Sequence, residues 1–255
     1  MPNLKLKTKI KFIQMENTVL HKANTRGHAN HGWLNAYHSF SFASWFNPER
    51  VQFGMLRVLN DDTVAAGMGF GTHPHDNMEI ITIPLEGDLA HKDSMGNSST
   101  IKTGDVQVMS AGTGIQHSEM NASQNDTAKT LQLWVFPDEE DVTPRYDQKS
   151  FDIENQINKF VTIVSPKDKN DGNALWVYQQ TFLNLGIFEK DTSISYKVNI
   201  PEHGVYIFLI EGEIEVDNKI LRTSDAMGII DFEQFEIKIN SKSKILLIEV
   251  PMKHN

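Results

Sequence analysis

The chain of 255 residues contains no cysteine. Disulfides, iron–sulfur clusters and thiolate zinc sites are therefore excluded, and any bound metal must be held by nitrogen and oxygen atoms. Basic residues are also in short supply, because 24 lysines and arginines stand against 33 acidic residues, for a formal net charge of −9. Direct binding of nucleic acid is disfavoured, since binding driven by phosphates needs a basic surface.

Long apolar runs are missing too, and none approaches the length needed to cross a bilayer. Residues 1–5 lack the charged-then-apolar pattern of a secretory signal. We therefore expect no membrane association and place the protein in the cytoplasm. The apolar content of 39% is ordinary for a globular protein, and we expect a monomer.

No long amphipathic helix stands out, whereas short β-branched and apolar runs separated by turn residues recur along the whole chain. These runs lie at 51–59, 79–85, 106–109 and 130–136, and then at 192–199, 205–210, 213–216, 235–239 and 244–250. Many short strands at this spacing are typical of an all-β sandwich or small barrel.

The chain divides at an acidic, apolar-poor segment with two prolines, residues 136–145. We expect a first domain at 1–137, a linker at 138–150 and a second domain at 151–255. A short helix around 144–151 is one alternative for the linker. The two halves echo each other, since LEGDL (85–89) resembles IEGEI (210–214) and KTGD (102–105) resembles RTSD (222–225). The offset exceeds the period of about 20–50 residues found in solenoids, so tandem copies of one β-domain explain it better.

Histidine is concentrated in the first half, where eight of the ten lie before residue 151. Two segments carry them in a telling pattern, GTHPH (71–75) and HSE (117–119). Side chains of a strand alternate between its faces, so as strands these segments would each aim two side chains the same way. His73, His75, His117 and Glu119 would then converge as three imidazoles and one carboxylate, a set that suits a divalent transition metal.

The same segments resemble the two signatures of the cupin superfamily. Gly67, His73, His75 and Glu79 have the spacing of the first signature, and GTGIQHSEMN (112–121) resembles the second. These two segments are similar to the pirin family in particular. Four further segments also resemble that family, namely HSFSFA (38–43), HKDSMGN (91–97), LQLW (131–134) and PRY (144–146). The resemblance is strong over residues 20–150 and only in outline beyond them.

Membership of the pirin family implies two tandem cupin domains, of jelly-roll type, with a metal in the first domain only. The implied ligands are His73, His75, His117 and Glu119. Glu79 is the rival carboxylate, because the wider superfamily usually places its acidic ligand there. The implied metal is Fe2+, although manganese, nickel, cobalt, copper and zinc also suit nitrogen and oxygen ligands. An ungapped alignment of the halves sets Val198, Ile200, Ile237 and Ile239 at the four ligand positions of the second domain, which would lack a metal.

The resemblance to bacterial pirin-like quercetin 2,3-dioxygenases implies an enzyme. Its substrates would be a flavonol and O2, the flavonol ring would be opened and CO released. Glu119 would be a ligand and also the catalytic proton acceptor from the flavonol hydroxyl. The alternative that the family implies is an iron-dependent, redox-sensing binding protein, which would act on a protein partner such as a transcription regulator or a metabolic enzyme.

The remaining histidines of the first half have plainer interpretations. His91 lies in a polar, turn-like segment, where we expect a solvated loop residue, with a role at the rim of the pocket as the alternative. His38 lies among aromatic residues, which favours a hydrogen-bonded packing role over ligation. His21, His28 and His31 lie in a polar segment and are expected to be exposed. The aromatic cluster at 33–46 is interpreted as packing material, with a pocket wall as the alternative.

Overall fold

The computed structural model describes residues 17–253, so residues 1–5 and His254 lie outside the part of the chain that it covers. Apart from two short 3-10 helices, η1 (Ala23–Thr25) and η2 (Lys167–Lys169), every regular element in this part is a strand. The expected all-β class is confirmed. None of the helices within residues 17–253 has the length and apolarity needed to cross a membrane.

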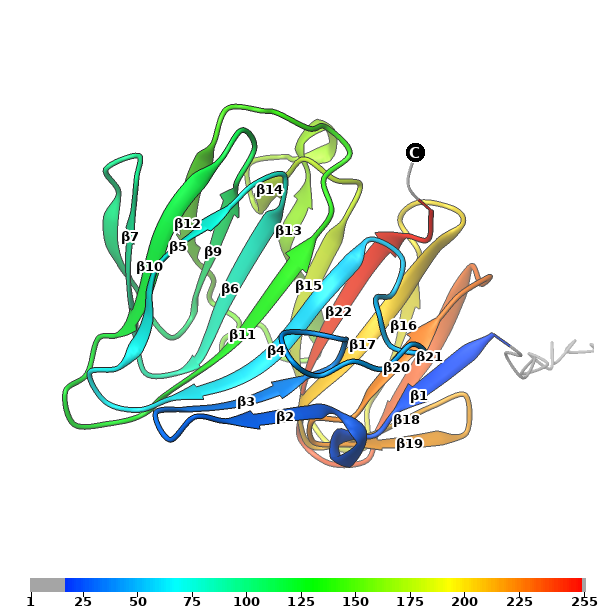
Figure 1. Ribbon diagram of the computed structural model, residues 1–255. Helices are drawn as coiled ribbons and strands as arrows, with labels where there is room; N and C mark the ends of the chain where they lie inside the picture. Colours follow the sequence, from blue (N-terminus) through cyan, green and yellow to red (C-terminus); the bar gives the residue numbers. More distant parts are fainter. Residues whose placement is uncertain (1–16, 254–255) are drawn as a thin grey trace, which may run out of the picture.

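Each half of the chain forms one sheet of seven strands and one of four (Figure 1). The large sheet of the first half has the order β12 (Arg145–Ser150), β9 (Asp105–Ser110), β6 (Glu79–Glu86), β11 (Ala128–Val135), β4 (Leu56–Val64), β3 (Leu34–His38) and β2 (Gly27–Asn30). Its small sheet has the order β5 (Gly69–His75), β10 (Ile115–Asn121), β7 (Leu89–Asp93) and β8 (Ser98–Ile101). The pairings within both sheets are antiparallel.

The second half repeats this plan. Its large sheet has the order β1 (Thr18–His21), β20 (Ala226–Ile229), β17 (His203–Glu211), β22 (Ser243–Pro251), β15 (Phe182–Phe188), β13 (Lys159–Pro166) and β14 (Leu175–Val177). Its small sheet has the order β16 (Ser193–Lys197), β21 (Gln234–Ile239), β18 (Glu213–Val216) and β19 (Lys219–Arg222). The repeated plan confirms the expected tandem of two jelly-roll domains.

The turns that carried the sequence echo occupy equivalent places in the two halves. Gly87 and Gly212 connect a large-sheet strand to a small-sheet strand, and both have positive φ, +70° and +103°. Asp105 follows β8 and Asp225 follows β19, and each carboxylate accepts the backbone N–H of the residue three positions earlier. The sequence similarity between the halves therefore reflects turn residues that both domains need where the chain passes from one sheet to the other.

The sheets do not follow the expected boundaries at two places. Strand β1, dark blue in Figure 1, pairs with β20 of the second half. The segment 145–150 is not the short helix considered for it but strand β12, which pairs residue by residue with β9. The backbone N–H and C=O groups along the edge of β9 need partners, and an extended segment supplies them where a helix could not.

The largest apolar core lies between the two seven-stranded sheets. Leu131 and Leu133 of β11 pack in one cluster with Leu183 and Leu246 from the second half. Because strand residues alternate, the residues between and after these leucines, Gln132 and Trp134, face the interior of the first half. Because one face of β11 packs against the second half, the side chains of its other face, Gln132 and Trp134, point toward the candidate site.

The interiors of the two halves differ in kind. Fifteen buried residues, among them Ile207, Ile237, Ile239 and Leu247, fill the second half with hydrocarbon. Each such side chain contributes about 1.5–3 kcal/mol when it is fully buried. The first-half interior instead buries polar side chains, which include Asn60, Asp62, Thr82, His91, Gln107, His117 and Glu119.

The ungapped alignment of the two halves needs one correction. His117 pairs with His73 across β10 and β5, and the corresponding strands β21 and β16 pair Ile237 with Ile194. Ile194 and Tyr196 therefore stand opposite β21, and not Val198 and Ile200, which follow the end of β16. The alignment failed because the loop after β5 (76–78) is shorter than the loop after β16 (198–202).

One buried carboxylate in the second half is fully provided with donors. Glu249 accepts hydrogen bonds from the hydroxyl of Tyr196 at 2.7 Å, from the side-chain amide of Asn199 at 2.9 Å and from the backbone N–H of Ile200 at 3.1 Å. Burial alone would raise the pKa of Glu249, but hydrogen bonds from His203, Asn199 and Tyr196 outweigh it and lower that pKa.

We predict that Glu249→Gln lowers the free energy of unfolding at pH 7 by about 1.5–3 kcal/mol, the usual contribution of hydrogen bonds to a charged group. A depressed pKa in the folded state stabilises the fold above the ordinary pKa of glutamate, and this contribution disappears as the pH falls through the depressed value. Urea unfolding of both proteins at pH 7 and in acid should show the difference narrowing in acid. Glu233→Gln, at an exposed position, is the control, and an equal loss in both variants would contradict the prediction.

Candidate metal centre

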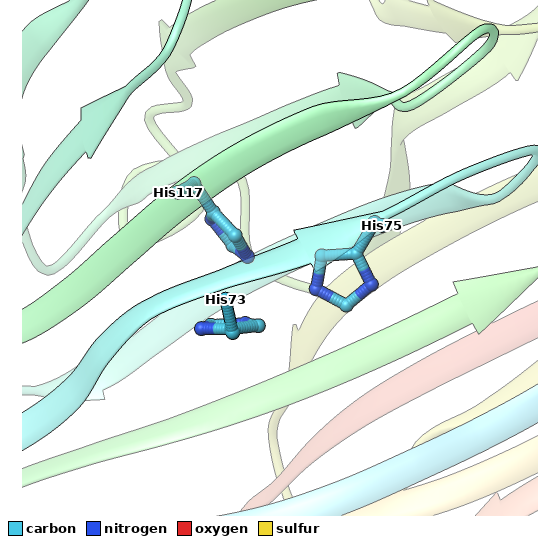
Figure 2. A group of neighbouring side chains, drawn as sticks. All are labelled: His73, His75 and His117. Atoms are coloured by element: carbon cyan, nitrogen blue, oxygen red, sulfur yellow. The ribbon is translucent and has the colours of Figure 1, made fainter.

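Two neighbouring strands of the small sheet bring three histidines together. His73 and His75 lie on the same face of β5, and His117 of β10 is the direct cross-strand partner of His73. The ring centroids are 4.4 Å apart for His73 and His117, and 4.9 Å apart for each of the other two pairs. One nitrogen from each ring lies within 4.8 Å of the other two, and Figure 2 shows the rings gathered beside the two strands.

The state of these rings fits a metal ligand. His117 is buried, and neither of its ring nitrogens has a hydrogen-bond partner. His73 donates from Nδ1 to the carbonyl of Gly71 at 2.8 Å, which leaves Nε2 with a free lone pair. Burial lowers the pKa of His75 to about 4 and that of His117 to about 3, with the neighbouring histidines adding to both shifts. Neutral rings with unshared lone pairs are the form that binds metal.

Glu119 lies on the same face of β10 as His117, but its carboxylate is outside the group of mutually close nitrogens. It is held from the opposite sheet instead. The hydroxyl of Thr82 donates to one carboxylate oxygen at 3.1 Å, and the side-chain amide of Gln132 donates to the other at 2.6 Å. The structure therefore brings together the three predicted imidazoles and sets the predicted carboxylate beside them, on partners of its own.

Glu79, the rival carboxylate, lies on a different face. It shares the face of Ile81, which packs in the core between the two large sheets. Its carboxylate accepts from the hydroxyl of Ser110 at 2.8 Å and from the backbone N–H of Tyr178 in the second half. Strand parity does not carry over from β5, because the intervening turn includes Asn77 with φ of +41°. Glu79 is engaged in joining the two halves.

A second carboxyl group faces the interior near Glu119. Burial raises the pKa of Asp62 to about 8, and the neighbouring carboxylates of Asp61 and Glu119 add to the shift. Asp62 is therefore protonated at neutral pH and adds no negative charge beside Glu119. Three imidazole rings with a carboxylate beside them form a donor set that suits a cation.

Aromatic side chains line one side of the histidine group. The ring of Trp134 stands edge-on to His75 at 4.9 Å, and Phe42 packs on Trp134 at 5.4 Å. Behind them, His38 contacts Phe42 and hydrogen-bonds Asn60 at 2.9 Å. His38 is thus the packed, hydrogen-bonded residue that the sequence indicated, and part of the aromatic cluster is a wall of the site.

His91 contradicts our expectation of a solvated loop residue. It lies in β7, is fully buried, and its ring is 5.4 Å from that of His117 and 4.6 Å from that of Tyr146. Its Nε2 is 3.2 Å from the carboxylate of Asp93, while Nδ1 has no hydrogen-bond partner. Alternation along a strand would have placed His91 and Asp93 on one face, and this was the available signal. The charged residues Lys92 and Asp93 made the segment resemble a turn instead.

The other histidines lie away from the group. His28 and His31 are exposed, as expected. The expectation was wrong for His21, which is buried and hydrogen-bonded to the hydroxyl of Tyr206 at 2.8 Å. Burial lowers the pKa of His21 to about 4, so it is a neutral packing residue.

Fold and site define the chain as a two-domain cupin whose first domain holds a group of histidines able to bind a metal ion. Two family models match it, the one described as Pirin over residues 19–135 and the one described as Quercetinase C-terminal cupin domain over residues 162–250. The chain belongs to the pirin family.

Relatives match over nearly their whole length. Quercetin 2,3-dioxygenase of Escherichia coli K12 is 43% identical over 91% of this chain and 98% of its own. A pirin-like protein of Caulobacter vibrioides is 35% identical over 88% of this chain and 95% of its own. The structure of the bacterial pirin YhhW from Escherichia coli in complex with nickel(II) superposes with a TM-score of 0.86 at 41% identity, covering 92% of this chain and 99% of that one.

We predict that the metal-free protein binds a single Ni2+ ion, and that His117→Ala weakens this binding by more than about 100-fold, beyond the loss expected from removing an orienting partner of a ligand. The measurement is isothermal titration calorimetry of the full chain. Glu79→Gln should bind as the parent does, because Glu79 faces the core between the halves. His28→Ala is the exposed-histidine control. Strong binding by His117→Ala, or its loss in Glu79→Gln, would refute this assignment of the site.

Proposed function

We propose that this protein is a metal-dependent quercetin 2,3-dioxygenase, which uses O2 to open the ring of a flavonol and releases CO. The observation that carries the proposal is the group of three mutually close imidazoles in the first cupin. It occurs in a chain that matches 98% of the length of a curated relative named for this activity.

His73, His75 and His117 would hold the ion, and we propose Glu119 as its fourth protein ligand. A bound divalent ion would supply Lewis acidity, lowering the pKa of a coordinated hydroxyl, together with redox contact to dioxygen. We propose Fe2+ as the resident ion. Nickel is the alternative, because the bacterial pirin YhhW has been solved in complex with nickel(II) and nitrogen and oxygen ligands suit both metals.

The protein's own residues would perform three tasks in this reaction. The wall of Trp134 and Phe42 beside His75 offers an apolar face to a planar ring system. Glu119, which lies on the same face of β10 as His117, would accept the proton of the flavonol hydroxyl. Thr82 and Gln132 would keep that carboxylate in the plane in which it can do so.

The direction of proton transfer follows from the charges. Asp62 is already protonated at neutral pH, so it cannot serve as the acceptor, whereas Glu119 has two donors that stabilise its charged form. A flavonol that has lost its hydroxyl proton is an electron-rich enolate, the form that dioxygen attacks. The proton acceptor and the aromatic wall come from opposite sheets, so a planar substrate would lie between them.

We predict that the metal-loaded protein consumes quercetin aerobically with release of CO, and that Glu119→Gln lowers kcat by about 100-fold or more, the usual contribution of a general base. Loss of the flavonol absorbance and gas analysis for CO measure the reaction, and elemental analysis identifies the resident metal. His117→Ala should be inactive and His28→Ala fully active. If the loaded protein releases no CO, the enzymatic proposal fails and the redox-sensing binding protein takes its place.

A further inference from the structure

Glu119 already has partners on two strands of the sheet opposite its own. It is almost fully buried on β10, yet both carboxylate oxygens accept side-chain hydrogen bonds that cross the interior from the large sheet. The bond from Gln132 is 2.6 Å long, at the short end of the range for charge-assisted hydrogen bonds, which are about twice as strong as neutral ones.

Gln132 is itself held in one orientation. Its side-chain oxygen accepts the indole N–H of Trp134 at 3.3 Å. An amide whose oxygen is engaged in this way turns its NH2 group, and not its oxygen, toward Glu119. Trp134 is in turn fixed between Phe42 and His75, so the orientation of the amide depends on the same wall that touches a proposed ligand.

The histidines and the carboxylate differ in what they would give up on binding a metal. His117 has no hydrogen bond to lose at either ring nitrogen. Glu119 would have to exchange at least part of its bonding to Gln132 and Thr82, because its oxygens lie outside the group of mutually close nitrogens. The three imidazoles are therefore already arranged to bind an ion, whereas the carboxylate would lose hydrogen bonds in order to reach it.

We propose that Gln132 is a positioning residue that competes with the metal for the carboxylate of Glu119. Its amide gives Glu119 a second place to bind, away from the imidazoles, so that the carboxylate exchanges between the ion and the amide. The inference rests on the metal site of the proposed function but not on its substrate.

This competition serves the proposed chemistry. A carboxylate bound to a cation is a weak proton acceptor, whereas one bound to a neutral amide keeps lone pairs available for a hydroxyl proton. Gln132 would thus allow Glu119 to leave the ion when substrate arrives without leaving a buried charge unpaired, which would be costly.

The test replaces Gln132 with methionine, which keeps the approximate volume and flexibility but removes both polar atoms. Loss of one hydrogen bond to a charged group should tighten Ni2+ binding to the metal-stripped full chain by roughly tenfold. Thr82→Val removes the weaker bond and should tighten binding less, in the same direction. A merely structural role would do the opposite, since damage to a site weakens metal binding.

Gln107→Met is the matched control, because Gln107 is a buried glutamine facing the same interior whose side chain makes no hydrogen bond. It should leave Ni2+ affinity within about twofold of the parent, below the effect of one hydrogen bond. Unchanged or weaker Ni2+ binding in both Gln132→Met and Thr82→Val, at parental thermal stability in at least one, would overturn the proposal.

Turnover of quercetin then separates the two claims. In an active enzyme, Gln132→Met should lower kcat more than it changes KM, because the carboxylate stays on the ion. If the parent protein does not turn over quercetin while Gln132→Met binds Ni2+ more tightly, the positioning role stands and only the dioxygenase proposal fails.

Discussion

A buried polar atom must find a partner, and the two interiors of this protein meet that requirement in opposite ways. In the second half, Glu249 is surrounded by donors from its own domain. In the first half, the ring nitrogens of His117 have none. Both domains have the same plan of sheets, so the difference lies chiefly in the side chains. Unpaired buried groups are rare in proteins, and the metal ion that we propose would complete a ring nitrogen of His117.

Most of the apolar burial that stabilises the protein therefore lies away from the site. The first-half interior holds small apolar clusters around its polar residues, whereas the second-half interior and the space between the large sheets hold the two largest cores. Strand β1 adds to this by binding the start of the described chain to the second half. Glu79, with its bonds to Ser110 and to the backbone of Tyr178, joins the two halves. The hydrocarbon of one domain thus supports a polar interior in the other.

The alternation of side chains along a strand was enough to predict that the three histidines lie close together. A period of two along GTHPH and HSE predicted the shared faces, and the direct pairing of His73 with His117 confirms them. The tandem of two domains was also predictable from the sequence, because glycine and aspartate recur at equivalent turns, where the local backbone geometry requires them. The rest depends on contacts distant in sequence. Parity failed at Glu79 because a single residue of positive φ lies in the turn before it. Strand β12 and the burial of His91 depend on neighbours that no short segment specifies.

Trp134 makes the two parts of the site dependent on one another. Its ring edge touches His75, and its indole N–H fixes the amide that holds Glu119. A movement of His75 on binding an ion would therefore displace the indole, and with it the hydrogen bond that orients Gln132. The coupling runs through packed, hydrogen-bonded groups, and these transmit small shifts because interiors have little free space. For that reason the carboxylate and the imidazoles are best regarded as one unit, in which the aromatic wall orients the amide that holds Glu119.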